Sequence, residues 1–440
     1  MTAIGTERLI LRCGTLIDGT GSAASEDVEL VIDQGLIASI GPWSGRDNSI
    51  GDASTVRDYR EHTVIPGVID GHAHICLGSP QSAGWASAER DPVSIVAWGL
   101  ASGLSALVSG VTTIVDVGSV DGLALKVASL VDGGLACGPR ILAAGRAITT
   151  TGGHGAAFGV CADTTPELVK AVRSEIANGA DLIKIMVTGG AITPKSNRRR
   201  AQYDQGELTA AISDAHRLGR LVVGHANATE GITWAVRSGI DIIAHCNWLG
   251  AEAGTVVIDF ETVDAMAERG TWVDLNIEGA LRDIGSADGI ASPPPGSLET
   301  PKNRWELLAP LRDRGVNMYL TSDAFGPSIG SFTRSLCDAR TICDLSAEKL
   351  VELVSEKPAR ALGLAGETGS ITVGKRADLV VLDGDLRSDP LALIHPRAVF
   401  RDGVEVVADR MLQPPRVALR SRDEVVAQEE LLRTVFRELD

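Results

Sequence analysis

Residues 64–75 read Val64-Ile-Pro-Gly-Val-Ile-Asp-Gly-His-Ala-His-Ile75. The apolar run with its Pro-Gly break predicts a buried strand that carries His72 and His74 at its C-terminal end. Side chains two positions apart on a strand point to the same side, so both imidazoles face one way. Such a pair is either half of a metal site or an ordinary polar face of a strand. Further ligands at the ends of later strands would decide for the metal site.

Segments typical of strands and of helices alternate from residue 64 to about residue 364. Eight such units favour a closed (β/α)8 TIM barrel over an open doubly wound sheet, because parallel strands need crossover helices. The absence of Gly-x-Gly-x-x-Gly after an early strand argues further against a dinucleotide-binding fold. The strands expected after the first are 112–117, 140–144, 182–187, 221–225, 240–245, 271–275 and 317–321. The expected helices are 95–109, 123–131, 165–179, 206–218, 229–238, 260–269, 306–314 and 346–362.

The two ends of the chain contain short β-rich segments separated by turn signals. We therefore expect residues 1–63 and 365–440 to form one small β-sandwich domain, built from both termini and flanking a barrel at 64–364. Apolar residues at helical spacing over 423–439 predict an amphipathic tail helix that packs on the body or on a partner subunit. We expect a homo-oligomer.

Composition restricts the possible partners. The chain has 440 residues, enough for a large core, and a formal charge of −16, which disfavours binding to nucleic acid or to an anionic membrane. It begins without a signal-like segment and has no run of ~18 apolar residues. Its seven cysteines show no Cys-x-x-Cys spacing, which is typical of a reducing compartment. We expect a cytoplasmic protein that acts on a small molecule.

Cys76 and Cys246 follow directly after His74 and His245. Either thiol could act as a nucleophile, but buried structural cysteines are commoner, and we favour that interpretation.

Lys184 lies inside the expected strand Leu-Ile-Lys-Ile-Met. An ammonium group among aliphatic side chains is costly to bury without a partner. Two explanations are open: a salt bridge, or reaction of the amine with carbon dioxide to give a carbamate that can bridge two cations.

Polar side chains occur at the C-terminal ends of several expected strands, where barrels carry their chemistry. Each alone has an ordinary alternative, such as a hydrogen-bonded core histidine or a helix-capping aspartate. Six at converging strand ends predict a site for zinc or a similar divalent ion, with two ions sharing the carbamate and a hydroxide. The candidate metal ligands are His72, His74, Lys184, His225, His245 and Asp323.

Several motifs resemble those of the amidohydrolase superfamily of metal-dependent hydrolases, and they extend over nearly the whole chain. They are similar in particular to the branch of imidazolonepropionase-like hydrolases and Xaa-Pro dipeptidases. The motifs are Pro66-Gly-Val-Ile-Asp-Gly-His-Ala-His74, Thr151-Gly-Gly-His-Gly155, Ile183-Lys-Ile185, Tyr203 before Glu207-Leu208, Gly224-His225, Ala244-His245, Ser322-Asp323 and Gly374-Lys-Arg-Ala-Asp-Leu-Val-Val-Leu-Asp383.

The resemblance implies a binuclear amidohydrolase, with a carboxylated Lys184 between two cations, most simply Zn²⁺. It assigns one cation to His72, His74 and Asp323, and the other to His225 and His245. A hydroxide bridging the metals would attack an amide-type C–N bond, with Asp323 as general base and then general acid.

His154 and Tyr203 are candidates for hydrogen bonds to the developing oxyanion. Their ordinary alternatives are a residue of a glycine-rich loop and a residue near a helix start.

The sequence predicts the identity of the substrate less well than it predicts the ligands. The loops that would form the pocket contain Trp85, Lys195, Arg198–Arg200 and Pro293–Pro295. The arginine run is either an anchor for a substrate carboxylate or a solvated loop. A basic anchor suits dipeptides or N-acyl amino acids, whereas aryl amides, ureas or carbamates require an apolar pocket.

Two other functions fit this sequence less well. A cyclic-amide hydrolase or a deaminase on the same barrel would normally lack the lysine of the fourth strand, and a deaminase would carry His-x-x-Glu where His225 is followed by Ala-Asn-Ala. A non-catalytic scaffold would have lost its metal ligands, and the intact ligand set argues against it.

Overall fold

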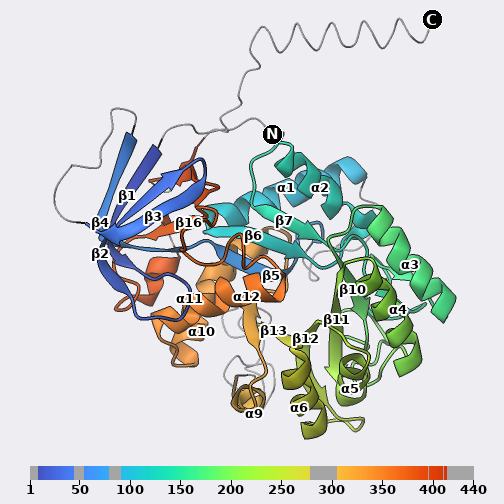
Figure 1. Cartoon of the computed structure of the whole chain (residues 1–440). Coiled ribbons are helices and arrows are strands. Elements are labelled where there is room, and N and C mark those ends of the chain that lie inside the picture. The colour runs from blue at the N-terminus through green and yellow to red at the C-terminus, as the bar shows by residue number, and fades with distance from the viewer. Residues whose placement is uncertain are drawn as a thin grey trace, which may run out of the picture.

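A computed structural model describes residues 8–43, 54–78, 91–277, 305–394, 396–409 and 411–413 (Figure 1). Within these residues the chain forms an α/β barrel of parallel strands and helices, joined to a sheet made from both ends of the chain. The predicted tail helix, Trp85 and Pro293–Pro295 lie outside the described residues.

The barrel strands pair in parallel, as the alternation of strands and helices predicted. The expected third strand consists of two pieces, β7 beside β6 and β8 beside β10. The short strand β15 (Ala324–Phe325) pairs with β5, so the eighth strand returns to the first and the barrel closes there. The strands are β5 (Val68–His74), β6 (Val111–Asp116), β7 (Arg140–Ala143), β8 (Ile148–Thr149), β9 (Val160–Cys161), β10 (Leu182–Met186), β11 (Leu221–Ala228), β12 (Ile242–Leu249), β13 (Trp272–Asn276) and β14 (Met318–Thr321).

The described helices occupy the predicted positions along the chain. They are α1 (Pro92–Val108), α2 (Ala124–Asp132), α3 (Thr165–Ala177), α4 (Gln205–Arg217), α5 (Thr229–Arg237), α6 (Phe260–Arg269), α9 (Ala309–Asp313), α10 (Phe332–Ile342), α11 (Ala347–Val354) and α12 (Glu356–Ala361). The helix α4 begins with a capping box between Asp204 and Glu207, which satisfies two backbone N–H groups at its start. Two details differ from prediction: α10 was not expected, and the helix expected over 346–362 breaks at Ser355, whose backbone is not helical.

Both ends of the chain contribute to one continuous eight-stranded sheet, in the order β19-β18-β17-β16-β4-β1-β2-β3. Figure 1 shows β16, from the C-terminal part, beside the blue N-terminal strands, and it pairs antiparallel with β4. Leu30, Leu379 and Phe400 from both parts share one buried core. The strands are β1 (Arg8–Leu16), β2 (Ser25–Asp33), β3 (Leu36–Pro42), β4 (Ser54–Pro66), β16 (Leu379–Leu382), β17 (Pro396–Arg401), β18 (Val404–Ala408) and β19 (Met411–Leu412).

Residues 64–75 are divided between the two parts of the fold. Val64 to Pro66 end β4 in the terminal sheet, and β5 begins at Val68 in the barrel. Gly67 makes this junction possible, because a Cβ atom there would lie 2.0 Å from the hydroxyl oxygen of Thr112. The strand that carries His72 and His74 therefore begins directly after the terminal sheet ends.

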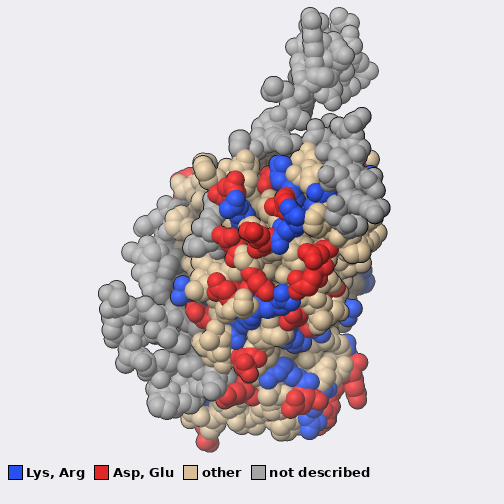
Figure 2. Space-filling view, turned by 90° about the vertical axis from the view of Figure 1, so that its left-hand side faces the viewer, with Lys and Arg blue, Asp and Glu red and all other residues tan. Residues whose placement is uncertain are grey.

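Acidic and basic side chains are interspersed over the described part of the face shown in Figure 2. No basic stripe of the kind that a polyanion requires crosses that described surface. Among the residues that the structure describes, none of the helices has the length and apolar character needed to cross a membrane.

Candidate metal centre

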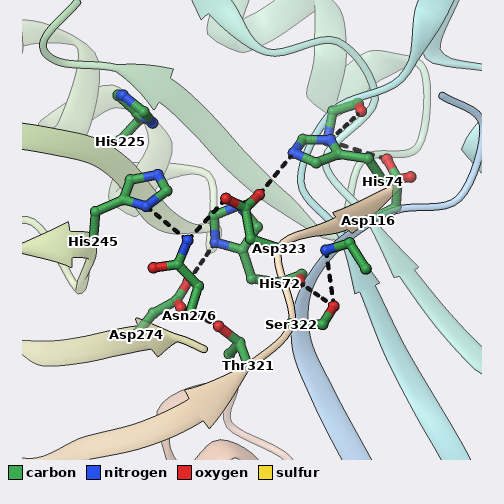
Figure 3. A network of polar contacts seen from close by, with 12 residues as sticks. His72, His74, Asp116, His225, His245, Asp274, Asn276, Thr321, Ser322 and Asp323 are labelled. Carbon is green, nitrogen blue, oxygen red and sulfur yellow. Dashed lines mark hydrogen bonds and ion pairs between the residues drawn. The ribbon is translucent and has the colours of Figure 1, made fainter. Parts of the chain in front are cut away.

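His72 and His74 direct the same ring nitrogen toward Asp323 (Figure 3). The Nδ1 atom of His74 donates to the carbonyl oxygen of Gly118 at 2.8 Å, and the Nδ1 atom of His72 lies 2.5 Å from Oδ2 of Asp274. With Nδ1 engaged in both rings, the Nε2 atoms lie 3.3 and 3.6 Å from Oδ1 of Asp323. One ligand atom from each of the three residues lies within 4.8 Å of the others, which suits a single divalent cation.

Asp323 is held against His72 by the connection that closes the barrel. Its backbone N–H donates to the carbonyl oxygen of His72 at 2.8 Å. Asp70, two residues before His72, accepts the backbone N–H of Ser322 at 3.0 Å and its hydroxyl at 2.5 Å. Asp323 has a left-handed backbone, with φ of +54°, and its side chain stays 23% exposed while that of His72 is 1% exposed. The carboxylate is thus fixed in place and reachable by solvent.

The charges of these three residues suit ligation. Burial raises the pKa of Asp323, but the neighbouring histidines, with His72 foremost, lower it further, so the group is a carboxylate. Burial lowers the pKa of His74 to about 3 and keeps its ring neutral. Burial and Lys184 also lower the pKa of His72, but Asp274 and Asp323 outweigh them and raise it to about 9. A bound cation would therefore displace the proton on His72.

His225 and His245 form a second group beside the first. Their ring centroids lie 4.3 Å apart, and that of His245 lies 5.6 Å from that of His72. The pairing of β11 with β12 shifts register between Ala226 and Ala228, and His245 has a φ of +71°. Such irregularities reorient side chains at strand ends, here so that the two imidazoles meet. Burial lowers the pKa of His225 well below its usual value, so its ring is neutral and able to bind a metal.

Lys184 is 1% exposed, and its Nζ atom has no hydrogen-bond partner among the described residues. The structure therefore gives no support to the salt bridge considered above. Burial lowers the pKa of the amine to about 8. Such an amine is more often unprotonated than that of an ordinary lysine. The unprotonated amine is the form that reacts with carbon dioxide. The unpaired amine thus fits the carbamate and the metal pair that the ligand set implies.

His154 lies against the second histidine group, with its ring centroid 4.3 Å from that of His225. Its Nδ1 atom is buried without a hydrogen-bond partner in the described part of the chain. The loop after β10 packs on this ring at Gly190, where a Cβ atom would lie 2.2 Å from a ring atom of His154. His154 is thus placed where it could contact a substrate held at the ligands.

Tyr203 is placed differently from the expectation. Its hydroxyl donates to the carbonyl oxygen of Ala162 at 2.9 Å, and its side chain is buried. Burial also raises the pKa of this phenol. The hydroxyl therefore has a structural partner, and none of its described contacts involves a candidate ligand.

Strand β13 carries two site residues that the sequence analysis missed. Asp274 contacts His72, and the Nδ2 atom of Asn276 lies 2.9 Å from Nδ1 of His245 and donates to Oδ2 of Asp323 at 2.8 Å (Figure 3). A signal for Asp274 was present in the sequence, because a carboxylate between apolar strand residues is as costly to bury as the amine of Lys184.

The arginine run is in part structural. Arg199 donates to the carbonyl oxygens of Gly250 at 2.8 Å and Thr255 at 2.9 Å, and so ties the loop after β10 to the loop after β12. Arg200 and Lys195 are exposed.

Apolar rings pack around His74 in the first ligand group. Phe325 stacks on His74 with centroids 5.0 Å apart, and Phe158 meets it edge-on at 5.8 Å.

Cys76 and Cys246 are buried, and burial raises the pKa of Cys76 well above its usual value. A thiol of that kind is not a nucleophile, which agrees with the structural interpretation.

Comparison with known proteins agrees with this geometry. Residues 63–409 match the model of the amidohydrolase family. The chain is 25% identical over 427 residues to ochratoxinase from Aspergillus niger, covering 89% of this chain and 84% of that protein. It is 23% identical over 413 residues to imidazolonepropionase from Rhizobium meliloti strain 1021, covering 89% of this chain and 92% of that one.

Solved structures give the same result. A Xaa-Pro dipeptidase with methionine bound in its active site is 26% identical, with a TM-score of 0.76, covering 90% of this chain and 99% of that one. A prolidase complexed with N-methylphosphonate-L-proline is 27% identical, with a TM-score of 0.78, covering 91% and 99%. Because the family model spans most of the chain, this protein belongs to the amidohydrolase family of hydrolases.

Proposed function

We propose that the protein is a binuclear metal-dependent hydrolase that cleaves an acyclic amide-type C–N bond. The observation that carries this proposal is the buried amine of Lys184, which has no hydrogen-bond partner in the described part of the chain, in a barrel whose mouth gathers the histidines and Asp323. Mononuclear members would have no use for such an amine, whereas a carbamate on it can join two cations. Zinc suits the mixed nitrogen and oxygen ligands.

The residues divide the work of hydrolysis. Two bound cations would supply a water of lowered pKa and polarise the scissile carbonyl. Asp323, held as a carboxylate and partly exposed, would accept the proton of the attacking water and pass it to the leaving nitrogen. His154 would donate a hydrogen bond to the oxyanion that develops on the carbonyl.

For the substrate, we propose a small amide with an apolar group next to the scissile bond. Phe158 and Phe325 pack against His74, and Arg199 is already committed to loop carbonyls. The resemblance to ochratoxinase and to Xaa-Pro dipeptidases supports amide cleavage, and the resemblance to imidazolonepropionase keeps a cyclic amide as the alternative. We further propose a cytoplasmic homo-oligomer without nucleic-acid or membrane partners. Assaying the purified protein on Xaa-Pro dipeptides, N-acyl amino acids, anilides, ureas and cyclic amides tests the assignment.

The purified protein is expected to contain about two divalent ions per chain, because the candidate ligands form two groups. Elemental analysis after dialysis measures this number. Chelation should abolish hydrolysis, and adding Zn²⁺ back should restore it. A protein without stoichiometric metal whose turnover is unaffected by chelator would contradict the proposal.

Tyr203→Phe is expected to lower the free energy of unfolding by about 1 kcal/mol, because the buried carbonyl of Ala162 loses its donor. Its turnover should stay close to that of the wild type. Urea denaturation and initial rates on the best substrate of the panel measure both. Tyr59→Phe, which removes a hydroxyl bound to Glu405 in the terminal sheet, is the matched control. A large loss of rate at unchanged stability would return Tyr203 to the oxyanion role.

A further inference from the structure

Asp274 is a fully buried carboxylate at the centre of the barrel, on a strand that offers no candidate metal ligand. Its Oδ2 atom lies 2.5 Å from Nδ1 of His72, and its Oδ1 atom accepts the hydroxyl of Thr321 at 2.5 Å. Both oxygens are thus engaged, one by β5 and one by β14. Figure 3 shows the carboxylate behind His72, on the side away from Asp323.

Barrel stability does not require a charge at this position. Removing a carboxylate from water costs several kcal/mol, and replacing a buried ion pair with apolar side chains is often neutral or stabilising. The residues before and after Asp274 along β13, Val273 and Leu275, are buried and apolar. Because burying a carboxylate there is costly, we look for its role in the chemistry of the site.

We propose that Asp274 is a positioning residue that prepares His72 to bind a cation. An ionised carboxylate can only accept, so it holds a proton on Nδ1 of His72 and leaves Nε2, which faces Asp323, as the nitrogen that can ligate a cation. A carboxylate partner also makes the imidazole a stronger base and a better ligand. Thr321 holds the second oxygen, and so fixes the carboxylate in the orientation that His72 needs. This inference rests on the proposed binuclear hydrolase.

His74 provides an internal comparison. Its Nδ1 proton goes to the neutral backbone carbonyl of Gly118, so its orientation does not depend on a charged side chain. The two histidines of one cation therefore have unequal support, from an anion in one case and from a peptide group in the other. Loss of Asp274 should weaken the cation that His72 helps to hold and leave the second histidine group in place.

The test measures the binding of Co²⁺ and Zn²⁺ to the metal-free full-length protein by chelator competition, and the visible absorption of the Co²⁺ form. Asp274→Ala should weaken one of the two cations about 10- to 100-fold, which is typical of losing an outer partner of a metal ligand. Asp274→Asn keeps an oxygen acceptor without the charge, so it should lose less. The Co²⁺ spectrum of Asp274→Ala should change, and Thr321→Val should change affinity in the same direction by a smaller factor.

Asp378→Asn is the matched control, because it alters a buried carboxylate that binds Arg140 and Thr368, away from the metal ligands. It should bind both cations as the wild type does. Unchanged metal affinity in Asp274→Asn and Thr321→Val, or an equal loss in Asp378→Asn, would overturn the inference. A wild-type protein that binds no stoichiometric cation would instead overturn the proposed function, so the two failures are distinguishable.

Discussion

Lys184→Ala is expected to lose most of its bound metal, and its turnover should fall by more than about 100-fold. This loss exceeds the one that usually follows removal of a residue that only hydrogen-bonds to a metal ligand. The reason is that Lys184 is the group proposed to join both cations, so its removal affects both at once. The side chain is 1% exposed, so a cavity remains where its chain and carbamate would lie. Elemental analysis and initial rates on the same preparation measure both losses.

A short carboxylic acid such as formate or acetate should restore part of the turnover of Lys184→Ala, because its carboxylate can enter that cavity and replace the carbamate. The same acid should leave the wild type unchanged. Lys170→Ala, at an exposed position on α3, controls for the loss of a lysine in general. If Lys184→Ala kept its metal and its rate, the bridging role would be wrong. A signal at the carbamate position in ¹³C NMR of protein equilibrated with labelled bicarbonate would test the modification directly.

Local patterns predicted the parts of the site that local geometry determines. The period of two on a strand puts His72 and His74 on one side, and the aliphatic neighbours of Lys184 mark it as buried. The regular alternation of elements predicted the barrel, which in turn gathers the ends of strands far apart in sequence. Asp323 was found for this reason, although 249 positions separate it from His74.

Contacts that depend on the exact packing of the barrel could not be predicted in this way. Asp274 reaches His72 over 202 positions, and this depends on how β13 and β5 face each other inside the barrel. The hydroxyl of Tyr203 donates to the carbonyl of Ala162, 41 positions away, because the two segments pack together. No sequence motif predicts this contact. The break at Ser355 is a different case, because Pro358 has no N–H to donate to the carbonyl of Val354, so the sequence did contain a local signal for it.

Asp323→Asn separates catalysis from metal binding. The amide oxygen of asparagine can still coordinate a cation, and the side chain keeps its shape, so fold and much of the metal should remain. An amide cannot accept the proton of the attacking water, so turnover should fall about 10²- to 10⁴-fold, which is the usual contribution of a general base. The rate should therefore fall far more than the metal content, and the decisive comparison is occupancy against turnover in one sample.

The pH dependence of the wild type should agree. The pKa of Asp323 is lowered mainly by the histidines around it, foremost His72, so the carboxylate persists at neutral pH and activity should be lost only as the pH falls. Because the group titrates together with its neighbours, the acidic limb of kcat/KM belongs to the set and not to one residue. In Asp323→Asn this limb should shift in the residual rate, because one member of the set no longer titrates. A fully metallated Asp323→Asn protein with near wild-type turnover would show that another group is the base, and His154→Asn would then be the next variant to measure, because His154 lies beside the same ligands.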